Sequence, residues 1–114
     1  MHELGIASAI VDAAVRHGEG RRVSVVSIRV GEMRQAVPAS LAFYFEIAAR
    51  GTACEGARLD VESVDALMSC TACGHQWDPA NGFRCPGCGA AGTEIVRGDE
   101  LEVESIEVEE AAHA

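Results

Sequence analysis

The fold is decided by Met68-Ser69-Cys70-Thr71-Ala72-Cys73-Gly74-His75, which Cys85-Pro86-Gly87-Cys88-Gly89 completes. Each half is a Cys-x-x-Cys pair followed by glycine, the pattern of a tetrahedral four-cysteine zinc site. Two residues between cysteines allow a tight turn that aims both thiolates at one ion. The glycine permits positive φ, so backbone amides can turn back toward the sulfurs. A hairpin between the pairs would bring four sulfurs to about 2.3 Å from the metal.

Redox dithiols or a pair of disulfides are the alternative interpretation of these cysteines. One Cys-x-x-Cys would be compatible with either, whereas two pairs with glycine-marked turns favour zinc. Because protein ligands then fill all four positions, the zinc is expected to be structural. The predicted ligands are Cys70, Cys73, Cys85 and Cys88.

Composition limits the classes of function. A chain of 114 residues fits one domain, or one domain with a small lobe. Nine arginines and no lysine stand against eighteen acidic residues, and the formal charge of −9 argues against nucleic-acid binding.

The same composition bears on the compartment. No apolar run approaches the roughly 18 residues of a membrane-spanning helix, and the N-terminus lacks the order of a secretion signal. Five cysteines are an odd number for a secreted disulfide framework, and thiolate ligands need a reducing compartment. We therefore expect a cytoplasmic protein that does not bind membranes.

Hydrophobic periodicity predicts two helices, one over residues 1–17 and one that begins at Pro38 and runs to Gly51. Phe43 and Tyr44 flank the apolar stripe of the second helix and are expected to cover a small sheet. The apolar stripes are Leu4, Ala7, Ile10 and Ala14 in the first helix, and Leu41, Ala42, Phe45 and Ala48 in the second.

Strands are predicted over residues 23–31, 59–68 and 101–108. The second strand leads directly into the first cysteine pair. In the third, apolar residues alternate with carboxylates that should project into water, and the phase shifts near Ser105, where a bulge is expected. These carboxylates are Glu100, Glu102 and Glu104.

The expected fold is therefore α+β: a small three-stranded sheet with two helices, plus an inserted four-cysteine zinc-ribbon lobe. We expect residues 1–67 and 96–114 to form the α/β domain and residues 68–95 to form the zinc-binding lobe.

The N-terminus Met1-His2-Glu3 is a second candidate metal site. The terminal amine, the His2 amide nitrogen and the His2 imidazole can close adjacent five- and six-membered chelate rings, and Glu3 could supply a fourth donor. Planar nitrogen-rich sets suit Ni(II) or Cu(II) more than Zn(II). A terminal Met-His is usually idle, so this pattern alone does not establish a nickel site.

Several motifs occur in the order found in one known family. They are Met1-His2-Glu3-Leu4 opening a helix, Val30-Gly31-Glu32, the segment 40–46, Glu55-Gly56-Ala57 before a strand, and the two cysteine pairs. Over nearly the whole chain, the sequence resembles the HypA/HybF family of hydrogenase maturation factors.

The resemblance implies a nickel metallochaperone that helps insert Ni(II) into nickel–iron hydrogenase, and in some organisms serves urease. Its partners would be a hydrogenase maturation GTPase and the hydrogenase large subunit precursor. The family's nickel ligands correspond here to Met1, His2 and Glu3, and its zinc ligands to Cys70, Cys73, Cys85 and Cys88.

One departure concerns the nickel site. Several relatives place an acidic residue where the second helix begins, but Val37-Pro38-Ala39-Ser40 offers no carboxylate. Either backbone amides suffice, or Glu32 or Glu46 substitutes.

Two further residues could bind metal. His75 follows the first cysteine pair and is more simply a surface residue than one linked to the zinc site. Cys54 lies apart from the pairs and is expected to be a small buried hydrophobe.

The sequence does not favour an enzyme, because it has no Ser/His/Asp arrangement, no phosphate loop and no open zinc position. The alternative function is a zinc-ribbon protein-binding module without a nickel role.

Overall fold

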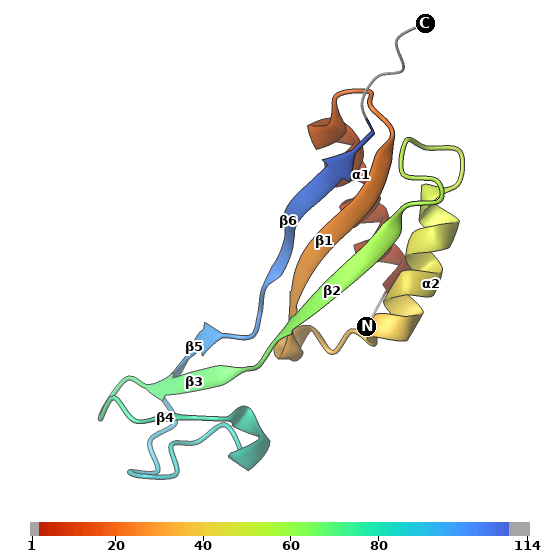
Figure 1. Cartoon of the computed structure of the whole chain (residues 1–114). Helices are drawn as coiled ribbons and strands as arrows, with labels where there is room; N and C mark the ends of the chain where they lie inside the picture. Colours follow the sequence, from red (N-terminus) through yellow and green to blue (C-terminus); the bar gives the residue numbers. More distant parts are fainter. Residues whose placement is uncertain (1–2, 110–114) are drawn as a thin grey trace, which may run out of the picture. The chain divides into compact units, whose positions relative to one another are not determined.

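The structure is a computed structural model that describes residues 3–109 (Figure 1). It is an α+β fold with two three-stranded sheets, ordered β2-β1-β6 and β4-β3-β5, which confirms the predicted class. The elements are α1 (Glu3–Gly18), β1 (Val23–Gly31), the 3₁₀ turn η1 (Glu32–Arg34), α2 (Pro38–Ala49), β2 (Arg58–Val64), β3 (Leu67–Cys70), β4 (Gln76–Trp77), the 3₁₀ turn η2 (Pro79–Asn81), β5 (Thr93–Arg97) and β6 (Leu101–Val108).

The described residues form two compact units. The first comprises residues 3–29, 36–62 and 102–109, and the second comprises 30–35 and 63–101. The second unit therefore contains all of 68–95 together with flanking residues and the turn η1. Across residues 3–109, the helices are too short or too polar to cross a membrane.

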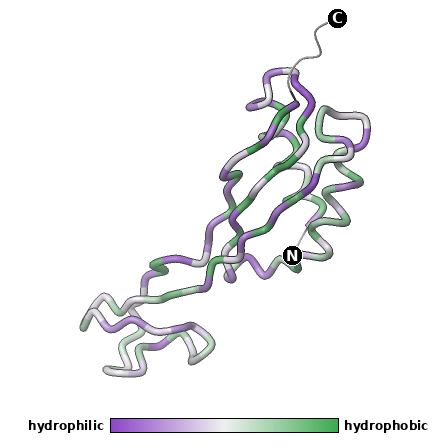
Figure 2. The backbone as a smooth tube through the Cα atoms, viewed as in Figure 1, coloured by the Kyte–Doolittle hydropathy of each residue, from purple (hydrophilic) through white to green (hydrophobic). Residues whose placement is uncertain are grey.

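In the first unit, α1 lies behind β1 in Figure 1 and packs against α2. Helix α2 begins at Pro38, whose fixed φ suits the first helical turn. Strand β1 buries Val26, Ile28 and Val30, while Ser27 and Arg29 stay partly exposed, as the alternation predicts. Hydrophobic and hydrophilic residues alternate along the strands in Figure 2. The helices contribute Ile6, Ala7, Ile10, Val11, Ala14, Leu41, Phe45 and Ala49 to this core.

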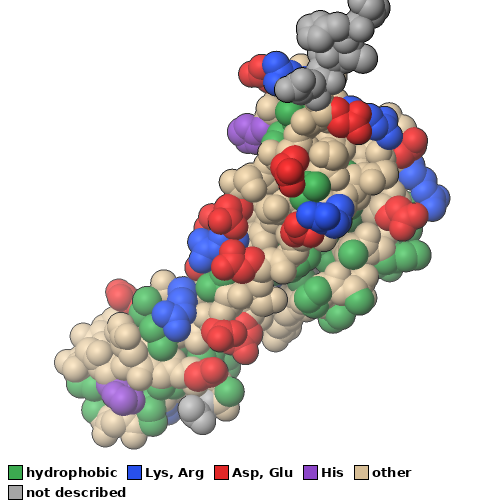
Figure 3. Space-filling model, in the orientation of Figure 1, with side chains coloured by type: hydrophobic (Ala, Val, Ile, Leu, Met, Phe, Trp, Pro, Cys, Tyr) green, Lys and Arg blue, Asp and Glu red, His purple; other side chains and the backbone are tan. Residues whose placement is uncertain are grey.

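Three helix positions differ from the prediction. Leu4 is 49% exposed although it was expected on the buried stripe, and Phe43 is 59% exposed rather than covering the sheet. Ala42 is also exposed, because α2 turns Leu41, Phe45 and Ala49 inward. In Figure 3 hydrophobic side chains gather over α2, where the exposed apolar residues are Phe43 and Ile47, with Val37 directly before the helix.

The predicted single strand over 59–68 is wrong. Strand β2 ends at Val64, and β3 begins at Leu67 in the other sheet. Strand pairing is interrupted at Ala66. Its amide N–H donates to the carboxylate oxygen Oε1 of Glu32 (2.8 Å) instead of to a neighbouring strand. An alternating apolar pattern continues across the break, so the sequence hides it.

Strand β5 was not predicted from the sequence. Met68 pairs with Ile95 and Leu67 pairs with Arg97, which leaves Val96 as an extra residue in a bulge. Ile95 and Val96 are both about half exposed, so β5 lacks the alternation by which strands are recognised. In β6 the exposure pattern does shift by one residue between Glu104 and Ser105.

In the second unit, backbone segments at Gly31, Gly98 and Ala66 come very close together, and this closeness limits which residues fit there. A Cβ on Gly31 would lie 2.0 Å from the carbonyl oxygen of Gly98, and a Cβ on Gly98 would lie 2.4 Å from the Cα of Ala66. Gly98 also has φ of +107°, a conformation that disfavours any side chain. Glycine is therefore required at both positions.

Gly98→Ala should destabilise the second unit by at least about 2 kcal/mol, since it adds a steric clash to the strain of positive φ. Trp77 is the only tryptophan and lies in this unit, so its fluorescence during urea unfolding reports the effect. The control is Gly51→Ala, where φ is +75° but the added Cβ meets open space. An unchanged Trp77 transition in Gly98→Ala would contradict the packing described.

Candidate metal centre

The four cysteines of the two pairs converge on one point. Their sulfur atoms all lie within 4.8 Å of one another. The Sγ atoms of Cys70 and Cys88 are 3.6 Å apart, as are those of Cys73 and Cys85. A tetrahedral zinc with sulfurs at 2.3 Å requires sulfur–sulfur separations of about 3.8 Å. All five cysteines of the chain are free thiols, and these four form a cluster that fits a tetrahedral metal such as zinc.

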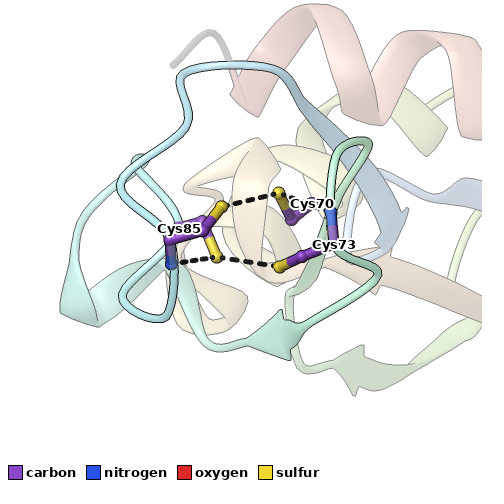
Figure 4. Close-up of side chains that lie close together, drawn as sticks. Cys70, Cys73 and Cys85 are labelled. Carbon is purple, nitrogen blue, oxygen red and sulfur yellow. Dashed lines mark hydrogen bonds between the residues drawn. The ribbon is translucent and has the colours of Figure 1, made fainter.

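The two cysteine turns share one backbone pattern. In the first, the Cys73 amide faces the Cys70 sulfur at 3.5 Å, and the Gly74 amide donates to the Cys70 carbonyl at 2.9 Å. In the second, the Cys88 amide faces the Cys85 sulfur at 3.4 Å, and Gly89 repeats the role of Gly74 at 2.8 Å. Both glycines have positive φ, as the sequence predicts. Figure 4 shows Cys70, Cys73 and Cys85 pointing toward one another.

These amides set the acidity of the thiols. The pKa of the Cys70 thiol is lowered to about 6, chiefly by the hydrogen bond from the Cys73 amide, with further lowering by the Ala72 amide that outweighs burial. At Cys73 the His75 amide lowers the pKa, but the hydrogen bond with the Cys85 thiol and burial outweigh it and raise the pKa to about 12.

In the second turn the pKa values of the two cysteine thiols are again shifted in opposite directions. Burial raises the pKa of Cys85, but the amides of Cys88 and Gly87 outweigh it and leave the pKa lowered. The cluster thus contains thiols that ionise easily and thiols that keep their protons until a divalent cation displaces them. Metal uptake therefore releases protons and strengthens as the pH rises.

The cluster has only a small hydrophobic core beneath it. Cys70 and Cys85 are buried with Met68 and Trp77, and Ala90 packs against them. The Trp77 indole N–H donates to the Gly82 carbonyl at 2.8 Å. Sequence reasoning missed Trp77, although it is the one tryptophan of the chain and lies two residues beyond the first cysteine turn. Because this core is small, we expect the second unit to need a bound metal in order to stay folded.

The predicted nickel donors are only partly within the described residues. Met1 and His2 lie outside them, and Glu3 occupies the first turn of α1, where it is half-buried. A carboxylate there is favoured by the positive end of the helix dipole. Within residues 3–109, the four cysteines are the only group of three or more potential metal ligands.

The two alternative carboxylates lie in different settings. The Glu32 carboxylate is engaged by the Ala66 amide, so one of its oxygens serves the backbone. Glu46 is exposed on α2, eight residues beyond Pro38, which is roughly 12 Å along the helix axis.

The expectation for Glu100 is wrong. Its Oε1 accepts a hydrogen bond from the Gly98 amide at 2.7 Å, and it precedes β6 rather than projecting from it into water. The turn at Gly98 leaves an amide that Glu100 satisfies. Glu102 and Glu104 are exposed on β6 as predicted.

His75 is an exposed residue whose ring stacks on Trp77, with centroids 6.1 Å apart. Cys54 is fully buried, and burial raises the pKa of its thiol. Both placements agree with the simpler interpretations of these residues.

The chain is thus an α+β protein whose second unit is built around a zinc-ribbon-like cluster of four cysteines. The sequence profile described as "Hydrogenase/urease nickel incorporation, metallochaperone, hypA" matches residues 1–108. Hydrogenase maturation factor HypA of Geobacter sp. strain M21 is 42% identical over 110 residues, covering 96% of this chain and all of that protein. The factor of the same name from Nostoc sp. strain PCC 7120 is 34% identical, covering 96% of this chain and 97% of that protein.

Solved structures share the fold. The solution structure of the Ni metallochaperone HypA from Helicobacter pylori superposes with a TM-score of 0.72 at 22% identity, covering 95% of this chain and 97% of that one. The profile match over residues 1–108 and the relatives at 42% and 34% identity show that the chain belongs to the HypA family of hydrogenase maturation factors.

Cys73→Ala should release the metal and unfold the second unit, because structural zinc contributes on the order of 10 kcal/mol to such a site. We expect the first unit to persist. Metal content by mass spectrometry, Trp77 fluorescence and far-ultraviolet circular dichroism measure the three quantities. The matched control is Cys54→Ala, which should keep one zinc per chain. Tight retention of one zinc by Cys73→Ala would exclude the proposed ligand set.

Proposed function

We propose that this protein is a nickel metallochaperone that binds Ni(II) and helps deliver it to nickel–iron hydrogenase during maturation. The observation that carries the proposal is membership of the HypA family over residues 1–108, in a chain that opens Met1-His2-Glu3. Its partners are a hydrogenase maturation GTPase and the hydrogenase large subunit precursor, and it acts in the cytoplasm. It has no catalytic role, in keeping with a family of metallochaperones.

Zinc is the resident metal of this proposal, held by Cys70, Cys73, Cys85 and Cys88. The mutual sulfur distances and the four-thiolate donor set fit Zn(II). When bound, the metal would cross-link the two cysteine turns. These residues would hold it with thiolates that the Cys73 and Cys88 amides support.

Nickel is the cargo, and its proposed donors are the Met1 amine, the His2 amide nitrogen and imidazole, and Glu3. Support comes from the start of α1 at Glu3, which places the helix directly after the two preceding donors. The helix fixes the backbone from Glu3 onward, which is the side of the proposed chelate that the structure describes. A chelate at a chain end can also open stepwise, which suits a carrier that must release its metal.

The alternative function is a zinc-ribbon protein-binding module without a nickel role. It rests on the same cysteine cluster and on the exposed apolar residues Phe83, Ile95 and Val96 of the second unit. Nickel titration of the purified protein separates the two functions, because a simple binding module takes up no nickel at the N-terminus.

His2→Ala should abolish tight nickel binding, measured by calorimetry, without changing the zinc content. The sharper variant adds Gly-Ser ahead of Met1. The imidazole survives there, but the amine leaves chelating distance, so the affinity should fall about as far as in His2→Ala. Undiminished nickel binding by the extended protein would place the nickel elsewhere.

Acid should weaken nickel binding. The amine and imidazole must lose protons to coordinate, and their unperturbed pKa values are about 7.7 and 6.5. Uptake should therefore fall steeply as the pH drops from about 7.5 to 6. A competition titration with a nickel indicator at several pH values measures this slope, and a flat profile would argue against nitrogen donors.

The acidic face of β6 should not contribute to tight nickel binding. Glu102 and Glu104 lie two residues apart on a strand, so their Cα atoms are roughly 7 Å apart, too far for one ion without a further loop. The double variant Glu102→Gln/Glu104→Gln should keep the wild-type nickel affinity. Glu100 stays intact, since it supports the turn at Gly98. Loss of tight binding in the double variant would show that the acidic face participates.

A further inference from the structure

Three backbone segments of the second unit meet at its base. The amide N–H of Gly31 donates to the carbonyl of Glu100 at 2.8 Å, and that of Met33 donates to the carbonyl of Gly98 at 2.7 Å. The third segment joins through a side chain, because the amide of Ala66 donates to Oε1 of Glu32 at 2.8 Å. We call this junction of residues 31–33, 65–66 and 98–100 the collar.

Glu32 supplies the acceptor that the break between β2 and β3 requires. Ala66 is 3% exposed, so its amide has little access to water. A buried amide without a partner is costly, and this one finds no strand partner at the break. A Cβ on Gly98 would lie 2.4 Å from the Cα of Ala66, so the two backbones are in close contact beside this hydrogen bond.

The collar lies where β3 begins and where its partner strand β5 ends. Strand β3 begins one residue after Ala66 and ends on Cys70, the first cysteine ligand. Strand β5 pairs with β3 and ends one residue before Gly98. A register error at Ala66 would therefore be carried along β3 to Cys70.

The turn η1 forms part of the collar and connects β1 to the segment before α2. Arg34 adds a second side-chain contact, as its Nε donates to the carbonyl of Asp99 at 2.8 Å. Gln35 then turns the chain with a left-handed φ of 55°, and the helix begins three residues later.

We infer that Glu32 is a positioning residue of the metal centre: its carboxylate fixes the start of β3 and couples the folding of the cysteine cluster to the turn η1. The inference rests on the proposed occupation of the cluster by zinc. It assigns Glu32 a backbone-supporting role instead of the role of an alternative nickel ligand.

The coupling between the cysteine cluster and the collar can be measured in the wild-type protein by removing zinc. Removal of zinc should speed hydrogen exchange at the amides of Gly31, Met33 and Ala66. The amide of Val23 donates to the carbonyl of Ala53 within the first unit at 2.8 Å, so its exchange should stay the same. Unchanged protection at Gly31 and Met33 in the zinc-free protein would contradict the coupling, provided that the cysteine turns themselves have lost protection.

The direct test compares the full-length, zinc-loaded wild-type protein with three variants: Glu32→Ala, Glu32→Gln and the exposed control Glu46→Ala. The readouts are amide exchange at Ala66 by NMR and the rate of zinc transfer to excess EDTA. Glu32→Ala leaves the Ala66 amide unpaired and should speed its exchange about tenfold, with faster zinc transfer. Glu32→Gln keeps an acceptor oxygen and should restore most of the protection. Glu46→Ala should match the wild type.

Two results would overturn the inference. One is wild-type exchange at Ala66 and wild-type zinc transfer in Glu32→Ala. The other is Glu32→Gln exchanging as fast as Glu32→Ala, which would remove the acceptor role. A wild-type protein that held no zinc would instead refute the proposed zinc site. Exchange at Ala66 would still report the Glu32 hydrogen bond in that protein, so the two failures are distinguishable.

Discussion

The convergence of four thiol groups within 4.8 Å is the constraint on which the second unit depends. Thiolates at this distance repel one another, and the core beneath them is no larger than Met68, Trp77 and the two buried cysteines. A divalent cation bound there would remove the repulsion and cross-link turns that are 15 residues apart in sequence. The collar at Gly31, Ala66 and Gly98 then fixes where β3, the strand that leads to the first cysteine turn, begins.

In the proposed function the two units have different roles: the second unit holds a structural metal, and the first unit carries nickel. A closed four-cysteine site holds its metal permanently, whereas a chelate at the start of α1 can open and release nickel. In this proposal the donor sets also differ in kind: sulfur dominates the zinc site and nitrogen the nickel site, a difference that would favour each metal at its own site. The carboxylate-rich surface, with a formal charge of −9, attracts cations without holding them in a defined place.

Local patterns predicted the elements whose signal is local. Both helices, β1, β6 and the cysteine turns follow from periodicity, Pro38 and the glycines after each cysteine pair. The break at Ala66 escaped prediction because its cause is Glu32, 34 residues away. Strand β5 escaped because its bulge exposes Ile95 and Val96 together, and Glu100 was misplaced because the turn at Gly98 captures its carboxylate. Long-range partners decided each of these cases.

The most direct test of the central claim is X-ray absorption at the zinc and nickel edges of protein loaded with one ion of each metal. The account predicts four sulfur neighbours for zinc at about 2.3 Å and only nitrogen and oxygen neighbours for nickel. Sulfur in the nickel shell, or fewer than four sulfurs around zinc, would contradict the separation of the two metals between the cysteine cluster and the N-terminus.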